Sequence, residues 1–97
     1  MRKGYWIVAY RSANDAEKLA RYIELAAPVL EGNGARFVVR GLPVKVYEAG
    51  VAERTVVIEF ASVAKAIEVY ESAEYQKAVE ALGDGAERDL RVLEAFA

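Results

Sequence analysis

The segments of this 97-residue sequence that resemble β-strands are apolar on both faces. Side chains alternate between the two faces of a strand, so residues two apart share a face. A sheet covered on one side only shows apolar and polar residues in alternation, which is not the pattern here. The sheet therefore needs a cover on each side. The two clearest cases are residues 4–10, with Tyr5, Ile7 and Ala9 opposite Trp6, Val8 and Tyr10, and residues 54–60, with Val56, Ile58 and Phe60 opposite Thr55, Val57 and Glu59.

Two helices are predicted between the strands. Asn14 or Asp15 can cap the first helix, which we expect to kink or break at Pro28, because proline has no amide donor. Ser62 can cap the second helix, and Ser72 can cap a further helical piece behind it. Strands are expected at residues 4–10, 35–40, 44–48, 54–60 and 90–96.

This β-α-β-(β)-β-α-β order predicts an α+β fold, the ferredoxin-like βαββαβ sandwich, as a single domain over residues 1–97. Its four-stranded, mainly antiparallel sheet gains an extra short hairpin strand at 44–48. We expect the first strand and the strand at 54–60 to lie parallel at the centre. Two helices cover one face of this sheet, and the apolar second face calls for a two-fold homodimer, sheet to sheet. The alternative is that Val44–Tyr47 and the chain ends fold over that face.

Composition excludes several classes of protein. The net charge of −2 argues against a nucleic-acid-binding protein with a basic face. Neither Cys nor His occurs, which removes disulfides, thiolate nucleophiles, Cys or His metal sites and every catalytic triad with a His base. There is no apolar run of about 18 residues that would cross a membrane, and no signal peptide is recognisable. We expect a cytoplasmic protein without cofactor or metal, with no membrane or nucleic-acid partner.

Two charged residues are candidates for chemistry. Arg40 ends a predicted strand beside Gly41, where its guanidinium can pair with a ligand carboxylate, or can simply be an edge-strand charge. Glu59 lies inside the most apolar strand, where a carboxylate can act as a general base with a perturbed pKa. The alternative is that Arg36 or Arg40 on the neighbouring strand holds Glu59 in an ion pair, which would lower its pKa instead.

Four further side chains are ligand-binding candidates. Trp6 can stack on a flat ligand, although a Trp in a central strand is more often core or interface. Tyr70 and Tyr75 flank Ser72 at the predicted helix break, so that their phenols and the Ser72 hydroxyl can line a pocket between helix and sheet. The alternative is that both rings fill the core and that Ser72 only caps the helix.

Several segments, in this order and spacing, resemble one known family over essentially the whole chain. They are Gly4-Tyr5-Trp6-Ile7, Ala26-Ala27-Pro28, 34–41 (Gly-Ala-Arg-Phe-Val-Val-Arg-Gly), 54–60 (Arg-Thr-Val-Val-Ile-Glu-Phe), 70–76 (Tyr-Glu-Ser-Ala-Glu-Tyr-Gln) and Val92-Leu93-Glu94. The family is the domain of unknown function 1330, in the dimeric α/β-barrel superfamily. The resemblance implies that fold and a dimer but no activity. The sequence departs from the pattern at Val69, Leu42 and Ala61, where the family usually has an aromatic residue, Gly and Pro.

Three functional hypotheses follow. The first is a homodimer that binds a small organic molecule, with or without a carboxylate, between sheet and helices, where Arg40 supplies charge and Tyr70 and Trp6 supply apolar surface. The second is a cofactor-free enzyme of oxygenase or isomerase type that acts on a small aromatic or carbonyl compound, with Glu59 as base and Arg40 stabilising an oxyanion. This one rests on analogy with the superfamily. The third is a structural interaction module with a filled core.

Overall fold

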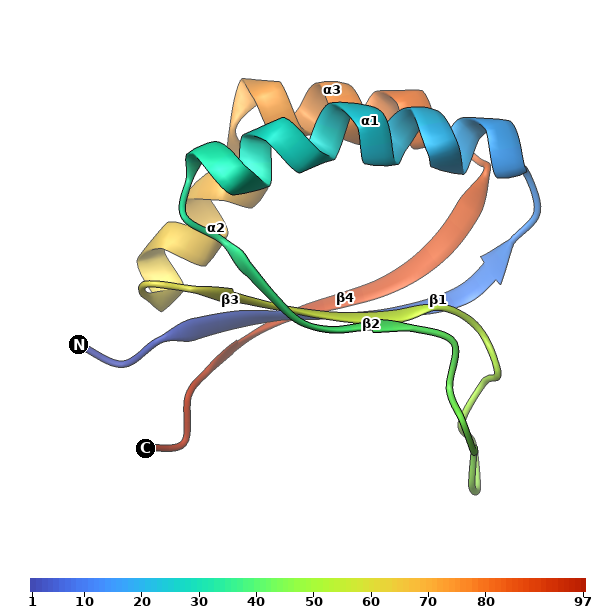
Figure 1. The fold of residues 1–97 in the computed structure, drawn as a ribbon, viewed down its shortest axis with the longest axis horizontal. Helices are drawn as coiled ribbons and strands as arrows, with labels where there is room; N and C mark the ends of the chain where they lie inside the picture. The colour runs from blue at the N-terminus through green and yellow to red at the C-terminus, as the bar shows by residue number, and fades with distance from the viewer.

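A computed structural model describes residues 1–97. Helices lie over one face of a four-stranded sheet and leave the other face open (Figure 1). The two chain ends lie close together at one end of the sheet, where the amide of Ala95 donates to the Lys3 carbonyl at 2.9 Å (Figure 1). In chain order the elements are β1 (Gly4–Ala13), α1 (Ala16–Gly32), β2 (Arg36–Gly41), β3 (Thr55–Phe60), α2 (Val63–Glu71), α3 (Ala73–Leu82) and β4 (Ala86–Glu94).

The strands are ordered β2-β3-β1-β4, and every neighbouring pair is antiparallel. The ferredoxin-like α+β fold is thus confirmed, but the expected parallel pairing of the strands at 4–10 and 54–60 is wrong, because β1 and β3 are antiparallel. β1 and β2 run parallel because a helix connects them, and β3 returns between them and so opposes both. Trp6 lies at the sheet centre, opposite Ile58 on β3 and Val92 on β4.

The helix boundaries follow local capping chemistry. Asp15 caps α1 by accepting from the amide of Lys18, and Ser62 caps α2 by accepting from that of Lys65. The break at Ser72 also occurs, so that α2 and α3 are separate helices. Of the kink or break predicted at Pro28, the break does not occur, since α1 continues to Gly32. Proline costs the helix one amide donor, and the burial of residues on either side of it, Ala26 and Leu30, offsets that loss.

The core lies between the helices and the sheet, and alternation along the strands decides which residues enter it. Of the two apolar faces of β1, the one with Trp6, Val8 and Tyr10 packs under the helices. The Trp6 indole donates to the carbonyl of Ala66 on α2 at 2.9 Å, so its one polar atom is satisfied. The buried apolar residues are Trp6, Val8, Tyr10, Tyr22, Ala26, Leu30, Val56, Ile58, Phe60, Ala66, Val69, Tyr75, Ala78 and Leu82.

The expected short strand at 44–48 does not form. Residues 42–54 are instead a loop that projects from the sheet on the side away from the helices (Figure 1). A strand needs a partner for its backbone, and a segment that leaves the sheet has none. A turn shapes the loop, in which the amide of Gly50 donates to the carbonyl of Tyr47 at 2.9 Å. Its apolar side chains Leu42, Val44 and Tyr47 are exposed, so the loop does not cover the open sheet face as a packed hairpin.

Candidate functional site

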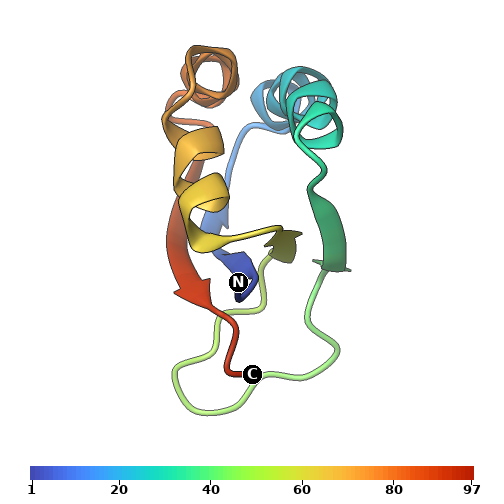
Figure 2. The same cartoon turned by 90° about the vertical axis from the view of Figure 1, so that its left-hand side faces the viewer.

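A pocket of about 300 Å³ lies beneath α1, between that helix and the β2–β3–β1 part of the sheet. Figure 2 shows the arrangement end-on, with α1 above the β2 side of the sheet and α2 and α3 above the β4 side. Most of the lining is apolar, and the polar lining is dominated by three arginines. The lining residues are Trp6, Val8, Tyr10, Tyr22, Ile23, Ala26, Ala27, Leu30, Glu31, Phe37, Arg40, Arg54, Val56, Ile58 and Arg88.

Two of the arginines flank the ring of Tyr10 from neighbouring strands. Arg54 precedes β3, and its carbonyl accepts from the amide of Tyr10 at 2.9 Å. Arg88 lies directly opposite Tyr10 on β4. Their guanidinium carbons lie 6.0 Å and 5.8 Å from the centre of the Tyr10 ring, within the range of cation–π attraction. The row Arg54–Tyr10–Arg88 therefore places two cations at one end of the pocket.

Arg88 also organises a pair of buried phenols. It donates to the hydroxyl oxygens of Tyr22 on α1 and Tyr75 on α3 at 3.0 Å and 3.3 Å. The two hydroxyls lie 2.6 Å apart. Burial alone would lower the pKa of Arg88, but the oxygens of Tyr22 and Tyr75 outweigh it, so the pKa lies above its ordinary value. For Tyr75, whose charged form is the anion, burial raises the pKa. Arg88 is therefore charged and Tyr75 neutral across the physiological range.

The third arginine, Arg40, stands at the outer edge of the pocket on β2. Its guanidinium lies 4.7 Å from the centre of the Phe37 ring. Arg40 faces two hollows, because it also borders a larger one of about 820 Å³ between the 42–54 loop and the open face of the sheet. The side chain is exposed.

None of these three arginines is neutralised by the protein. The chain has eight arginines, and a carboxylate lies between 3.1 and 3.6 Å from each of the other five. No carboxylate lies within 4.0 Å of Arg40, Arg54 or Arg88. The Nε of Arg54 is in addition buried with no hydrogen-bond partner. A buried donor without a partner costs about 1–3 kcal/mol, which a native structure commonly keeps for a functional reason.

The structure brings only some of the predicted residues to this pocket. Arg40 and Trp6 line it, although Trp6 offers only its ring because Ala66 occupies the indole N–H. Tyr75 lies behind the pocket wall, in contact with Tyr22. Tyr70 instead borders a separate open hollow between α2 and β4.

Ser72 is occupied as a helix cap. Its hydroxyl donates to the carbonyl of Val69 at 2.7 Å and accepts from the amide of Tyr75 at 3.3 Å. Those two hydrogen bonds use the proton and one lone pair of the hydroxyl and hold the junction between α2 and α3. Ser72 therefore acts in the geometry of this junction and not in the lining of the pocket.

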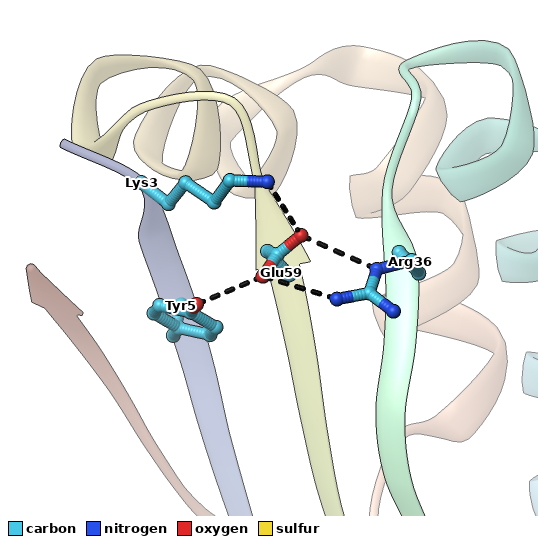
Figure 3. A network of polar contacts seen from close by, with 4 residues as sticks. All are labelled: Lys3, Tyr5, Arg36 and Glu59. Carbon is cyan, nitrogen blue, oxygen red and sulfur yellow. Dashed lines mark hydrogen bonds and ion pairs between the residues drawn. The ribbon is translucent and has the colours of Figure 1, made fainter. Parts of the chain in front are cut away.

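Glu59 lies on the open face of the sheet, opposite Tyr5 on β1, and does not line the pocket. Figure 3 shows Lys3, Tyr5 and Arg36 around its carboxylate. Arg36 on β2 donates to both carboxylate oxygens at 3.3 Å, Tyr5 donates at 2.8 Å and Lys3 at 3.0 Å. Hydrogen bonds from Arg36, Tyr5 and Lys3 lower the pKa of Glu59 to about 2. Of the two sequence-based alternatives, the structure thus contains the ion pair with Arg36. A carboxylate with so low a pKa is a poor general base at neutral pH, and we leave Glu59 out of the proposed site.

Four pocket residues had no place in the sequence-based site: Tyr10, Tyr22, Arg54 and Arg88. On α1, Tyr22 is 7% exposed and the adjacent Ile23 is 38% exposed, so the helix buries the tyrosine and not the aliphatic residue beside it. Arg54 and Arg88 look like ordinary charges at strand ends. The sequence shows only that Arg54 lies at the start of the apolar strand predicted at 54–60. Its position beside Tyr10 and Arg88 follows from the order of the strands in the sheet.

No three acidic side chains come together anywhere in the chain as ligands of an ion would. None of the three helices has the length and apolar character that a membrane crossing requires.

Comparison with known proteins identifies a family. The family model described as a domain of unknown function, DUF1330, matches residues 3–96. No curated protein is similar enough in sequence to match the chain.

Solved structures share the fold at low sequence identity. A protein of unknown function from Rhodopseudomonas palustris is similar at 21% identity over 99% of this chain and 84% of its own, with a TM-score of 0.76. A cofactor-independent oxygenase, SnoaB from Streptomyces nogalater, is similar at 10% identity over 100% of this chain and 96% of its own, with a TM-score of 0.67. A dimeric ferredoxin-like protein of unknown function from Thermobifida fusca is similar at 10% identity over 97% and 92%, with a TM-score of 0.63.

Proposed function

Since this chain belongs to the family described as domain of unknown function DUF1330, we propose a function from its own pocket: the protein binds a small organic molecule that carries a carboxylate, held between the helices and the sheet. The observation that carries this proposal is the distribution of arginine partners. The three arginines that line the pocket are the three without a carboxylate, although acidic residues outnumber basic ones, 15 to 13. A bound anion would supply the missing partner.

The rest of the lining indicates the chemistry of the ligand's other end. Trp6 lies further along β1 than Tyr10 and its two flanking arginines, and Leu30 on α1 and Phe37 on β2 add apolar lining. Trp6 and Tyr10 are four residues apart on β1, which is roughly 13 Å at the rise of a strand. The volume of about 300 Å³ lies at the small end of known ligand pockets. The expected ligand is therefore a compact acid with an apolar, aromatic or branched body.

A thermal-shift screen followed by calorimetry tests the proposal. The probes are benzoate, trans-cinnamate and 2-naphthoate, with the corresponding carboxamides as uncharged controls. We expect at least one acid to bind and its amide to bind at least tenfold more weakly, because a hydrogen bond to a charged group is worth about 1.5–3 kcal/mol. The variant Arg54→Met should no longer bind the acid. Arg21→Ala is the matched control, because Arg21 lies exposed on α1 and is paired with Glu24. If no acid binds, the proposal is wrong.

Catalysis on the bound compound is the second candidate. Its support is that the fold is shared with a protein described as a cofactor-independent oxygenase, and that arginines and phenols can stabilise an oxyanion. Against it stands the shortage of candidate bases, because the lining holds a single carboxylate, that of Glu31, and this residue is exposed. Recovering the bound acid unchanged after prolonged incubation in air, by mass spectrometry, supports binding alone. Conversion to a product supports catalysis.

We also propose that two copies pair sheet to sheet about a two-fold axis. The centre of the open face is apolar, with Ile7, Val57 and Val39 on adjacent strands. Charged groups lie around this centre, with Glu59 and its partners at one end, Asp89 and Arg11 at the other, and Arg91 beside Ile7 on the edge strand β4. An apolar centre with a polar rim is typical of an interface between proteins. The Thermobifida fusca neighbour is described as dimeric, which supports the same arrangement.

Sedimentation at micromolar concentration tests the dimer. Val39→Asp is the informative variant, because Val39 is 54% exposed in one copy and a folded monomer tolerates a charge there. In a dimer the same charge would be buried, so we expect Val39→Asp to sediment as a folded monomer. Ile67→Asp is the control, because Ile67 is also exposed but lies on α2, on the helix side. A monomeric unmodified protein would contradict the dimer.

A further inference from the structure

In the hydrogen-bond network around Arg88, the hydroxyl proton of Tyr22 has no acceptor within the protein. The two phenol oxygens lie 2.6 Å apart, so one hydroxyl donates to the other. Tyr75 is fully buried and does not line the pocket, and Tyr22 is the one acceptor within reach of its hydroxyl proton. If Tyr22 donated to Tyr75, the Tyr75 proton would be buried without an acceptor. Tyr75 is therefore the donor and Tyr22 the acceptor.

The oxygen of Tyr22 is then saturated as an acceptor. A phenol oxygen has two lone pairs and one proton. One lone pair accepts from Tyr75, and the other accepts from Nη1 of Arg88 at 3.0 Å. The remaining proton has no partner in the protein, and Tyr22 lines the pocket. Two donors to one oxygen, one of them charged, polarise its O–H bond and make it a stronger donor.

We propose that Tyr22 is a specificity-determining residue that donates its hydroxyl proton to an oxygen of the bound acid, with Arg88 and Tyr75 as the residues that position it. This inference rests on the proposed function, and it names the chemistry that the pocket selects. Nε of Arg54 is a second unpartnered donor at the pocket, and it is buried. A group that only accepts hydrogen bonds satisfies both atoms. A carboxylate is such a group, whereas a carboxamide or an amine brings protons of its own.

Two isosteric variants separate this role from a structural one. Tyr22→Phe removes the donor to the ligand, and Tyr75→Phe removes a hydroxyl from the same cluster but leaves the Tyr22 proton in place. Each loses one oxygen atom and keeps the ring, so each should fold. With 2-naphthoate or trans-cinnamate as the probe in calorimetry, we expect Tyr22→Phe to weaken binding about tenfold or more. Tyr75→Phe should stay within about threefold of the unmodified protein, because it affects the ligand only through Tyr22.

A second measurement needs no ligand. Hydroxyl exchange of the two tyrosines can be followed by isotope shifts at 13Cζ in the free protein. We expect the Tyr75 hydroxyl to exchange slowly, because its proton is buried and hydrogen-bonded, and the Tyr22 hydroxyl to exchange rapidly through the pocket. In Tyr22→Phe the slow exchange at Tyr75 should be lost together with its acceptor.

The outcomes distinguish the inference from the proposed function. If an acid binds, needs Arg54 and is unaffected by Tyr22→Phe, the inference is overturned and the function stands. Slow exchange at Tyr22 with fast exchange at Tyr75 overturns it as well, because the proton then points from Tyr22 to Tyr75. If benzoate, trans-cinnamate and 2-naphthoate all fail to bind, the function and the inference fall together.

Discussion

Replacing Arg54 with methionine should make the free protein more stable while it destroys the binding site. The Nε of Arg54 is buried with no partner, and leaving such a donor unpaired costs about 1–3 kcal/mol. Methionine keeps an unbranched chain of similar length without that donor. The change also removes the attraction between the guanidinium and the Tyr10 ring at 6.0 Å, which is worth about 0.5–1 kcal/mol. The net expectation is a gain of up to about 2.5 kcal/mol.

Urea denaturation of the free protein measures this change, at one fixed protein concentration because an oligomer's apparent stability depends on concentration. For a domain of this size, 1 kcal/mol corresponds to roughly 4–8 °C in Tm, so thermal melting is a second readout. Arg21→Met on the exposed face of α1 is the control and should stay within about 0.5 kcal/mol. A loss of 1 kcal/mol or more in Arg54→Met would refute the reasoning, because Arg54 would then stabilise the fold and would not be held for a ligand.

Three further predictions concern the fold. Gly4→Ala should lower the free energy of unfolding by about 1–3 kcal/mol, as measured by urea denaturation. The added Cβ would lie 2.6 Å from the Ser62 carbonyl oxygen, which belongs to the backbone and cannot easily move aside. The folded-state pKa of Glu59 is lowered to about 2, so its stabilising contribution is complete above its ordinary pKa and is lost as pH falls toward 2. Melting curves of Glu59→Gln should accordingly lie below those of the unmodified protein at pH 7 and converge with them near pH 2. Tyr22→Phe should lower stability by about 1–3 kcal/mol through the orphaned Tyr75 hydroxyl, and adding Tyr75→Phe should restore part of it.

The element order and both faces of the strands were predictable from the sequence, because period-two alternation and Ser and Asp caps are local signals. The sequence did not predict which face of β1 enters the core, because Trp6, Val8 and Tyr10 are about as apolar as Tyr5, Ile7 and Ala9. Tertiary packing also overrode a local signal at Pro28. The strand predicted at 44–48 failed for a related reason, because alternation of Val44 and Val46 with polar neighbours supplies a face but not a partner strand.

The candidate site was predictable only in part. Arg40 and Trp6 lie on the segments that line the pocket, and the position of Arg40 at a strand end was a usable signal. Arg54, Arg88 and Tyr22 come from three distant parts of the chain, and no local spacing links them. What marks the two arginines is the lack of a carboxylate partner, which can be seen only in three dimensions. An arginine without a carboxylate cannot be recognised in a sequence in which acidic residues are abundant.

The measurement that tests the central claim most directly is a titration of the arginine side chains. In 1H–15N spectra that resolve the Nε resonances, 2-naphthoate or trans-cinnamate is added to the unmodified protein. We predict saturable shifts at Arg54 and Arg88, both at the pocket, and none at Arg21 or Arg36, which are already paired with Glu24 and Glu59. Equal, non-saturating shifts at all four arginines, or no shift at any of them, would contradict the account.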